Sequence, residues 1–257
     1  MKVDFVIAGT QKSGTTTLQK FLSQHPSVHM ATTKGTHFFD TESHFADGGV
    51  DYSAYHSFFS PQPHHSLIGE ATPIYSFWEP AARRIWEYNP GMKVIVVLRN
   101  PIDRAYSHWN MQRSKTRERH SFEEALALEE ERAHAALPLQ DRHFSYVSRG
   151  FYTEQLRRLA RYFPSVQSLV LRMEDVLNPG TDAADRIWNF LGLQSPGPLP
   201  LPHANQRHYT APMAAATRRG LLETFEYEIR ALERMLGWDL NSWLVEPTVA
   251  SSDRVTE

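Results

Sequence analysis

The stretch that decides the fold lies near the N-terminus and reads Val3-Asp4-Phe5-Val6-Ile7-Ala8-Gly9-Thr10-Gln11-Lys12-Ser13-Gly14-Thr15-Thr16-Thr17. Its first six residues are rich in β-branched and aromatic side chains and end at a glycine, which predicts a short buried strand. From Thr15 to Ser23, apolar residues recur at helical spacing, and His25-Pro26 ends the predicted helix. The chain therefore opens with a strand, a loop bounded by glycines, and a helix.

The loop from Gly9 to Gly14 has the features of an anion-binding site. A loop between a strand and a helix can aim several backbone N–H groups at one anion, and the start of the helix adds partial positive charge. A nucleoside-triphosphate loop reads G-x-x-x-x-G-K-[ST], but here Thr15 stands at the lysine position and Lys12 lies on the other side of Gly14. This argues against ATP with Mg²⁺. An ordinary glycine turn before a threonine-capped helix is the alternative for this motif taken alone.

The remaining pattern alternates strands with helices. We expect further strands at 68–71, 93–98 and 168–171, further helices at 52–59, 80–88, from about 102, from 121, 153–163, 185–191 and 217–236, and a loop at 132–148. This alternation predicts one three-layer α/β domain over residues 1–257, with a P-loop-like central parallel sheet of about five strands flanked by helices. We expect the tail after about residue 249 to be disordered.

A second motif follows the strand at 93–98 and reads Leu98-Arg99-Asn100-Pro101-Ile102-Asp103-Arg104-Ala105-Tyr106-Ser107. Arg99 comes at the carboxyl end of that strand, the edge where open α/β sheets bind ligands. Ser107 falls about two turns into the next helix. Together they could bind a second phosphate, distinct from the one on the first loop, although a surface arginine and a helix serine are each common alone.

Composition excludes several classes of function. A formal net charge of −2 in 257 residues argues against a nucleic-acid partner, and the absence of cysteine excludes thiolate catalysis and Cys-based metal sites. No spacing of metal ligands is convincing, so we expect no metal. No apolar run is long enough to span a bilayer, so we expect no membrane insertion, a chain that starts at Met1, and a cytoplasmic location.

The two motifs together resemble the PAPS-dependent sulfotransferases, which use 3′-phosphoadenosine 5′-phosphosulfate. The pair K-x-G-T-T-x-L and R-N-P-x-D-R-A-x-S is similar to the heparan-sulfate N- and 3-O-sulfotransferase branch and its bacterial relatives. The resemblance covers most of the chain, and the supporting segments are Glu70-Ala71-Thr72-Pro73-Ile74-Tyr75, Gly150-Phe151-Tyr152 and Arg207-His208-Tyr209-Thr210-Ala211-Pro212-Met213. It implies the same fold, metal-independent transfer from PAPS, and the product 3′-phosphoadenosine 5′-phosphate (PAP).

The resemblance also assigns residues to the donor. The phosphate loop would bind the 5′-phosphosulfate end, Arg99 and Ser107 the 3′-phosphate, and a late loop would close over the nucleotide, with Tyr152 near the adenosine. The donor-binding residues expected in this way are Gln11, Lys12, Ser13, Gly14, Thr15, Thr16, Thr17, Arg99, Ser107, Tyr152, Arg207, His208 and Tyr209. Lys12 would also be catalytic, because it can stabilise the charge that grows on the leaving phosphate.

The general base departs from the family pattern. The family has a glutamate in a segment like K-E-x-H-F-F-D, and this chain reads Lys34-Gly35-Thr36-His37-Phe38-Phe39-Asp40. A second departure is Ala71, where many relatives have a lysine. Three interpretations remain: His37 takes the proton, since imidazole suits this task near neutral pH; Glu70 reaches the site; or the chain binds PAPS and transfers poorly or not at all. We favour His37, with Glu70 second, although both could be structural side chains.

The sequence does not identify the acceptor, and we expect a hydroxyl or amine of a saccharide or a small metabolite. The basic residues in 111–120 could line a groove for an anionic saccharide, but a solvated helix face balanced by nearby glutamates is the stronger interpretation. Two rival functions remain beside a sulfotransferase. One is a nucleotide-binding protein without catalysis, motivated by Gly35, and the other is a kinase on the same fold, which Thr15 argues against.

Overall fold

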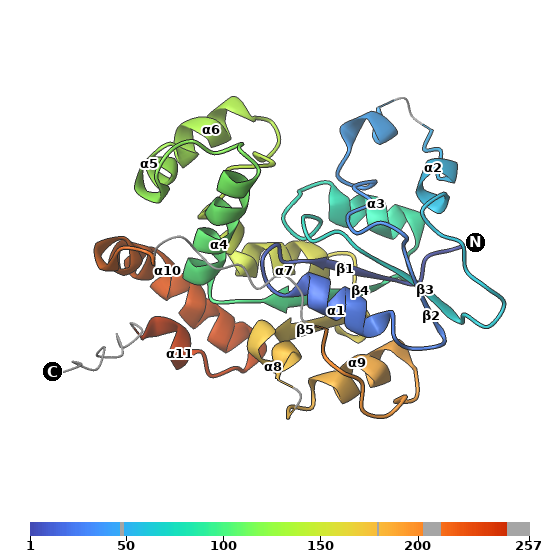
Figure 1. Ribbon diagram of the computed structural model, residues 1–257. Helices are drawn as coiled ribbons and strands as arrows, with labels where there is room; N and C mark the ends of the chain where they lie inside the picture. Colours follow the sequence, from blue (N-terminus) through green and yellow to red (C-terminus); the bar gives the residue numbers. More distant parts are fainter. Residues whose placement is uncertain (47–48, 179, 203–211, 246–257) are drawn as a thin grey trace, which may run out of the picture.

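The computed structural model describes residues 1–46, 49–178, 180–202 and 212–245 (Figure 1). Its strands are β1 (Phe5–Gly9), β2 (Val28–Met30), β3 (Leu67–Ala71), β4 (Lys93–Leu98) and β5 (Ser168–Arg172). They form one parallel sheet in the order β2-β3-β1-β4-β5. The predicted fold class, an α/β fold with a five-stranded parallel sheet, is confirmed.

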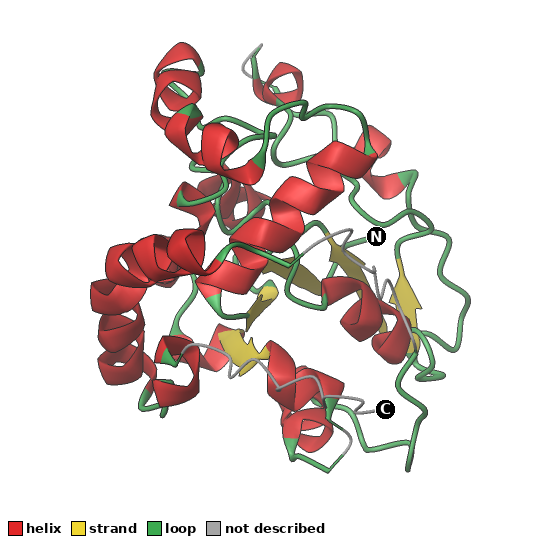
Figure 2. Ribbon diagram, turned by 60° about the vertical axis from the view of Figure 1, so that its left-hand side comes forward, coloured by secondary structure: helices red, strands yellow, loops and turns green. Residues whose placement is uncertain are grey.

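Helices flank the sheet, and they connect its parallel strands (Figures 1 and 2). The α-helices are α1 (Thr15–Leu22), α2 (Ser53–His56), α3 (Ala81–Tyr88), α4 (Pro101–Ser114), α5 (Phe122–Ala127), α6 (Glu129–Ala135), α7 (Tyr152–Ala160), α8 (Met173–Leu177), α9 (Ala183–Leu191), α10 (Ala215–Leu236) and α11 (Asn241–Leu244), with short 3₁₀ turns η1 (Glu42–Phe45), η2 (Ser148–Gly150) and η3 (Ser165–Gln167). No helix in these described ranges is long and apolar enough to cross a bilayer.

The two faces of the sheet bury separate cores. Successive residues of a strand point to opposite faces, so Val6 and Val96 contribute to one core while Ile7 and Val97 contribute to the other. The first core takes side chains from α3, α4, α7 and α10, and the second takes them from α1, α8 and α9. Burial on both faces explains why β1 and β4 are almost continuously apolar.

The parallel order places the functional segments at one edge. The carboxyl ends of all five strands face the same way, and the phosphate loop leaves β1 in the centre of the sheet. Arg99 follows β4 on one side of that loop, whereas the segment from Lys34 to Asp40 follows β2 on the other side. The sheet therefore arranges the two predicted halves of the site around the loop.

Several details of the predicted elements are wrong. The structure adds β2, a strand of three residues, and two short helices, α8 with five residues and α11 with four. These elements are too short for a periodic pattern to be recognised. The loop expected from residue 132 begins later, because α6 continues to Ala135.

Candidate active site

The phosphate loop is fixed by its own polar contacts. Thr10 donates from both its N–H and its Oγ1 to the carbonyl of Val97, over 2.8 and 2.9 Å, and its Oγ1 lies 2.6 Å from Ser13 Oγ. Lys12 and Gly14 have positive φ angles of 76° and 78°. These left-handed residues turn the chain into α1.

The start of α1 is free of a side-chain cap. Its N-cap is Gly14, which has no side chain to accept from the first N–H groups of the helix. Such N–H groups, together with the helix dipole, favour an anion. This geometry supports the predicted anion-binding role of Gly14, Thr15, Thr16 and Thr17.

Lys34 contacts this loop, and the sequence analysis did not select it. Its Nζ donates to Thr15 Oγ1 over 3.1 Å and also to Thr16 Oγ1. Burial, followed by repulsion from Lys12, lowers the pKa of Lys34 to about 8. Its position directly before Gly35 was the only available signal, since β2 was not predicted and nothing in the sequence placed residue 34 beside residue 15.

Arg99 directly follows β4, as predicted, and its side chain lies against the phosphate loop. Its Nη1 donates to the carbonyl of Lys12 over 3.2 Å. Ser107 lies two turns into α4 and is buried, with 6% of its surface exposed. The cap of α4 is Asn100, whose side chain accepts from the N–H of Ile102. The end of β4 and the cap of α4 thus fix Arg99 and Ser107 on one side of the loop.

Tyr152 corrects a prediction. We expected its side chain near the adenosine, but it is 0% exposed and its hydroxyl donates to the carbonyl of Arg99 over 2.9 Å. Burial raises its pKa to about 12, so the phenol stays neutral. Tyr152 therefore positions Arg99 and does not present a ring surface to a nucleotide.

Gln11 is held by Arg149, a second residue that the sequence analysis missed. Arg149 Nη1 donates to Gln11 Oε1 over 2.8 Å, and its guanidinium lies 4.7 Å from the ring centroid of Phe77. Burial and the nearby Arg104 lower the pKa of Arg149 to about 9. An arginine before a glycine has no local signal that distinguishes it from a surface residue.

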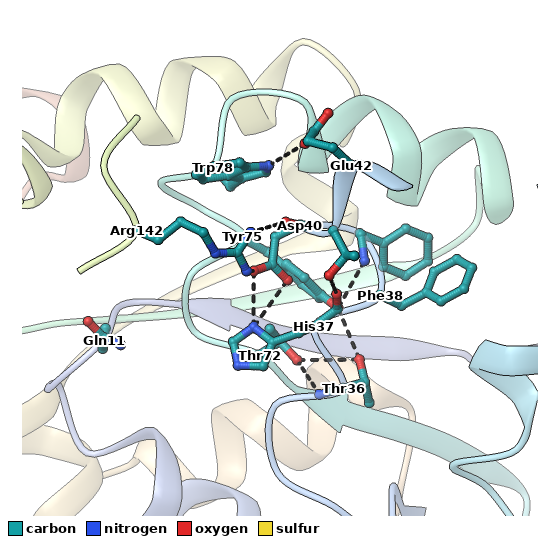
Figure 3. A network of polar contacts seen from close by, with 12 residues as sticks. Gln11, Thr36, His37, Phe38, Asp40, Glu42, Thr72, Tyr75, Trp78 and Arg142 are labelled. Carbon is teal, nitrogen blue, oxygen red and sulfur yellow. Dashed lines mark hydrogen bonds and ion pairs between the residues drawn. The ribbon is translucent and has the colours of Figure 1, made fainter. Parts of the chain in front are cut away.

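His37 belongs to a network with Asp40 and Arg142 (Figure 3). Its Nδ1 lies 3.0 Å from Asp40 Oδ2 and 3.2 Å from Oδ1, and Asp40 is fully buried. Arg142 pairs with the same carboxylate and lies 4.8 Å from the ring centroid of Trp78. An Nδ1–H donated to a carboxylate leaves Nε2 as the ring's proton acceptor. The side chain of His37 is 53% exposed, so the ring is accessible.

The missing side chain at residue 35 makes room for this imidazole. Gly35 has a φ of +78°, and a Cβ built on it would lie 3.0 Å from His37 Nε2. His37 itself has a positive φ of 52°. A side chain at residue 35 would meet the ring, so the imidazole occupies space that the absence of a Cβ leaves open.

Glu70 corrects a second prediction. We named it as an alternative base, but the carboxyl is fully buried and accepts hydrogen bonds from Thr36 (2.9 Å), Thr72 (2.6 Å) and Tyr55 (3.0 Å). Burial raises its pKa, although these hydroxyl donors oppose the shift. A carboxyl enclosed by three donors cannot reach an acceptor. Glu70 instead fixes Thr36, between Gly35 and His37.

A groove begins beside the phosphate loop. It has a volume of about 520 Å³ and is lined by α1, β2 and the following residues, among them Thr16, Lys20, His29, Lys34 and His65. Thr16 and Lys34 therefore belong both to the loop contacts and to the groove. Within the described ranges, no group of three or more His, Asp and Glu side chains could hold a metal ion.

Three predicted donor residues, Arg207, His208 and Tyr209, lie outside the described residues. Apart from Tyr152 on α7, the other predicted donor residues fall into two groups, one on the loop after β1 and the start of α1, and one formed by Arg99 after β4 and Ser107 on α4. The structure brings these groups together through the contact between Arg99 and Lys12.

Known proteins are similar to this chain in sequence. A sulfotransferase domain model matches residues 2–206. The chain is 34% identical over 189 residues to mouse heparan sulfate glucosamine 3-O-sulfotransferase 6, a match that covers 74% of this chain and 52% of the mouse protein. It is 30% identical over 200 residues to human bifunctional heparan sulfate N-deacetylase/N-sulfotransferase 2, covering 74% of this chain and 22% of the human protein.

A solved structure agrees over nearly the whole chain. The crystal structure of a sulfotransferase from Alicyclobacillus acidocaldarius superposes with a TM-score of 0.82 at 27% sequence identity, covering 95% of this chain and 99% of that one. The chain spans about half the length of the mouse relative and about a fifth of the human one. The domain match, the identities and the shared fold lead to one conclusion: this chain belongs to the sulfotransferase family.

Proposed function

We propose that this chain transfers a sulfuryl group from PAPS to a hydroxyl or amine of a saccharide or small-metabolite acceptor, without a metal. The observation that carries the proposal is the contact between Arg99 and the phosphate loop, 3.2 Å from Arg99 Nη1 to the carbonyl of Lys12. It joins two anion-binding elements, as a donor with phosphates at both its 5′ and 3′ ends requires. Family membership supports PAPS as the donor.

The loop binds the 5′-phosphosulfate end and stabilises the leaving group. In the transfer, the acceptor oxygen or nitrogen forms a bond to sulfur while the bond from sulfur to the bridging oxygen breaks. Negative charge then grows on the phosphate of departing PAP. This charge is stabilised by Lys12, by the hydroxyls of Thr15 and Thr16, and by the N–H groups at the start of α1. Electrostatic stabilisation of this kind is usually the largest contribution to catalysis of such reactions.

His37 accepts the proton of the acceptor. Its Nδ1 is held by buried Asp40, its ring is partly exposed, and Gly35 leaves room for the ring. The proton moves from the acceptor to Nε2 as the new bond to sulfur forms. The hydrogen bond to Asp40 stabilises the imidazolium that results.

Transfer of radiolabelled sulfate from PAPS tests the proposal. We expect the purified chain to label at least one acceptor from a panel of saccharides and phenolic or aliphatic alcohols, in the presence of EDTA. Binding of PAP without labelling of any acceptor would favour a nucleotide-binding protein without catalysis, the alternative that Gly35 motivates. Labelling that needed a divalent cation would contradict the metal-independent mechanism.

A further inference from the structure

Lys34 is a buried cation attached to the phosphate loop from outside it. It lies after β2, and its Nζ donates to the hydroxyl oxygens of Thr15 and Thr16 at the start of α1. A lysine that donates to two neutral hydroxyls leaves their hydrogens free to point elsewhere, toward whatever occupies the loop. This arrangement prepares both the lysine and the hydroxyls for an anion.

The surroundings of Lys34 do not neutralise it. Lys12 faces it from the phosphate loop, while Lys20 on α1, His29 on β2 and His65 line the same groove. Among the described residues, no carboxylate forms an ion pair with it. Placing a second ammonium beside Lys12 in a largely buried position is unfavourable without an anion. We therefore expect Lys34 to bind an anion.

The position of Lys34 in the sheet indicates which part of the donor it contacts. Arg99, expected at the 3′-phosphate, follows β4 on one side of the central loop, and Lys34 follows β2 on the opposite side. His37, the proposed base, follows the same strand as Lys34. The donor must therefore run from the β4 side to the β2 side, with its sulfuryl end toward Lys34.

We propose that Lys34 is a catalytic residue that binds the oxygens of the sulfuryl group during transfer. The proposal rests on the proposed function and adds one residue to it. With the donor present, the ammonium group shifts from the hydroxyls of Thr15 and Thr16 to the sulfuryl oxygens, and the two hydroxyls donate to the adjacent phosphate. Lys12 and Lys34 then hold the two sides of the bond that breaks.

PAP and PAPS differ by the sulfuryl group alone, so the ratio of their affinities isolates this contact without any acceptor. We would measure both dissociation constants by calorimetry for the wild type, Lys34→Met and Lys34→Arg. The matched control is Lys20→Met, which removes an exposed ammonium from the same groove. We expect Lys34→Met to weaken PAPS binding about 10- to 100-fold, the range for a charged hydrogen bond, and PAP binding less than about 3-fold.

A pH series gives a second readout. Because bound anion favours the charged lysine, PAPS affinity should fall as the pH rises above about 8, the pKa of Lys34 in the free protein. This fall should be smaller for PAP and absent in Lys34→Met. Lys34→Arg should keep both the charge and most of the PAPS affinity, without the fall.

The outcomes separate this inference from the function on which it rests. Unchanged affinities for both PAPS and PAP in Lys34→Met would overturn the assignment of Lys34 to the sulfuryl end. Equal losses of affinity for the two nucleotides would overturn it as well, because they would place the contact on the 5′-phosphate. If the wild type bound neither nucleotide, the proposed function itself would fail.

Discussion

At the scale of single residues, the proposed base depends on Gly35 and on His37, two positions later. The left-handed backbone at Gly35 and the imidazole of His37 are coupled, because a Cβ at residue 35 would lie 3.0 Å from Nε2. The buried carboxylate of Asp40 binds Nδ1 and so leaves Nε2 as the nitrogen that can accept a proton. A base can therefore be present although residue 35 is a glycine and not the glutamate that the sequence resemblance leads us to expect.

His37→Ala should abolish most of the transfer and leave donor binding intact. Loss of a general base costs about 10²- to 10⁴-fold in rate, while the phosphate loop and Arg99 are untouched. The rate is measured by sulfate transfer and the affinity by PAP calorimetry. His134→Ala, an exposed histidine on α6, is the control and should change neither. A His37→Ala protein with the wild-type rate would remove His37 from the mechanism.

Glu70 should matter for stability more than for catalysis. Glu70→Ala leaves three buried hydroxyls without their acceptor and should lower the free energy of unfolding by about 2–4 kcal/mol. Glu70→Gln keeps the shape and should retain more than about a third of the transfer rate. Urea unfolding and the transfer assay measure the two effects. A folded Glu70→Gln variant without activity would restore Glu70 as a candidate base.

The pH dependence of the free energy of unfolding also tests the structural role of Glu70. Because burial raises the pKa of Glu70, the folded chain holds this proton to a higher pH than the unfolded chain does. Its contribution to stability is therefore greatest below the unfolded pKa and decreases as the pH rises through the folded one. Glu70→Gln should lack this decrease, so its deficit against the wild type should shrink at higher pH.

At the scale of elements, the ends of parallel strands do the positioning. Arg99 and the phosphate loop meet because β1 and β4 are neighbours in the sheet and end at the same edge. The cap on α4 and the hydroxyl of Tyr152 then hold Arg99 in place. The two phosphates of a donor can thus be bound by two adjacent strand ends.

Arg99→Ala should weaken binding of the donor's 3′-phosphate without weakening binding of its 5′ end. We expect a loss of PAP affinity of about 10- to 100-fold, the range for a charged hydrogen bond to phosphate. Binding of adenosine 5′-phosphosulfate, which has no 3′-phosphate, should stay the same. Arg83→Ala, which breaks an exposed ion pair on α3, is the control. Equal losses for both nucleotides would move Arg99 away from the 3′-phosphate.

The turn into α1 predicts the cost of a side chain in the loop. Gly14→Ala forces a left-handed alanine and brings its Cβ within 3.2 Å of Met173 Cγ, so it should lower stability by about 1–2 kcal/mol and weaken PAP binding. Gly220→Ala in α10, where a Cβ meets nothing within 4 Å, should instead raise stability by up to about 1 kcal/mol. Urea unfolding of both variants tests this, and a Gly14→Ala protein of wild-type stability would contradict it.

Local patterns predicted the elements that are long or bounded by clear signals. The strand before Gly9, the strand before Arg99 and the capping box at Ser121 are all present. The residue types in the two motifs also predicted a loop between β1 and α1 and the position of Arg99 at the end of β4. Lys34, Arg149 and Arg142 could not be predicted as partners of the loop and of Asp40, because those contacts depend on tertiary distances. Tyr152 and Glu70 were misassigned for the same reason, since burial decides what a polar side chain can reach.

At the scale of the whole molecule, the two halves of the sheet position different parts of the proposed site. The β4 side holds Arg99 and Ser107, the centre holds the phosphate loop, and the β2 side holds Lys34, His37 and the groove. Both faces of the sheet are covered by helices (Figure 2), so the edge formed by the strand ends is the place left for a ligand. A donor across that edge would direct its reactive end toward the base.

The most direct test of this account is the binding of PAP by calorimetry in EDTA, compared with ATP in the presence of Mg²⁺. We expect PAP to bind at about micromolar affinity or tighter and ATP to bind hardly at all, because Thr15 replaces the lysine of a triphosphate loop and because we propose that Arg99 binds the 3′-phosphate. Tighter binding of ATP, or PAP binding that required the metal, would contradict the sulfotransferase mechanism and favour a kinase.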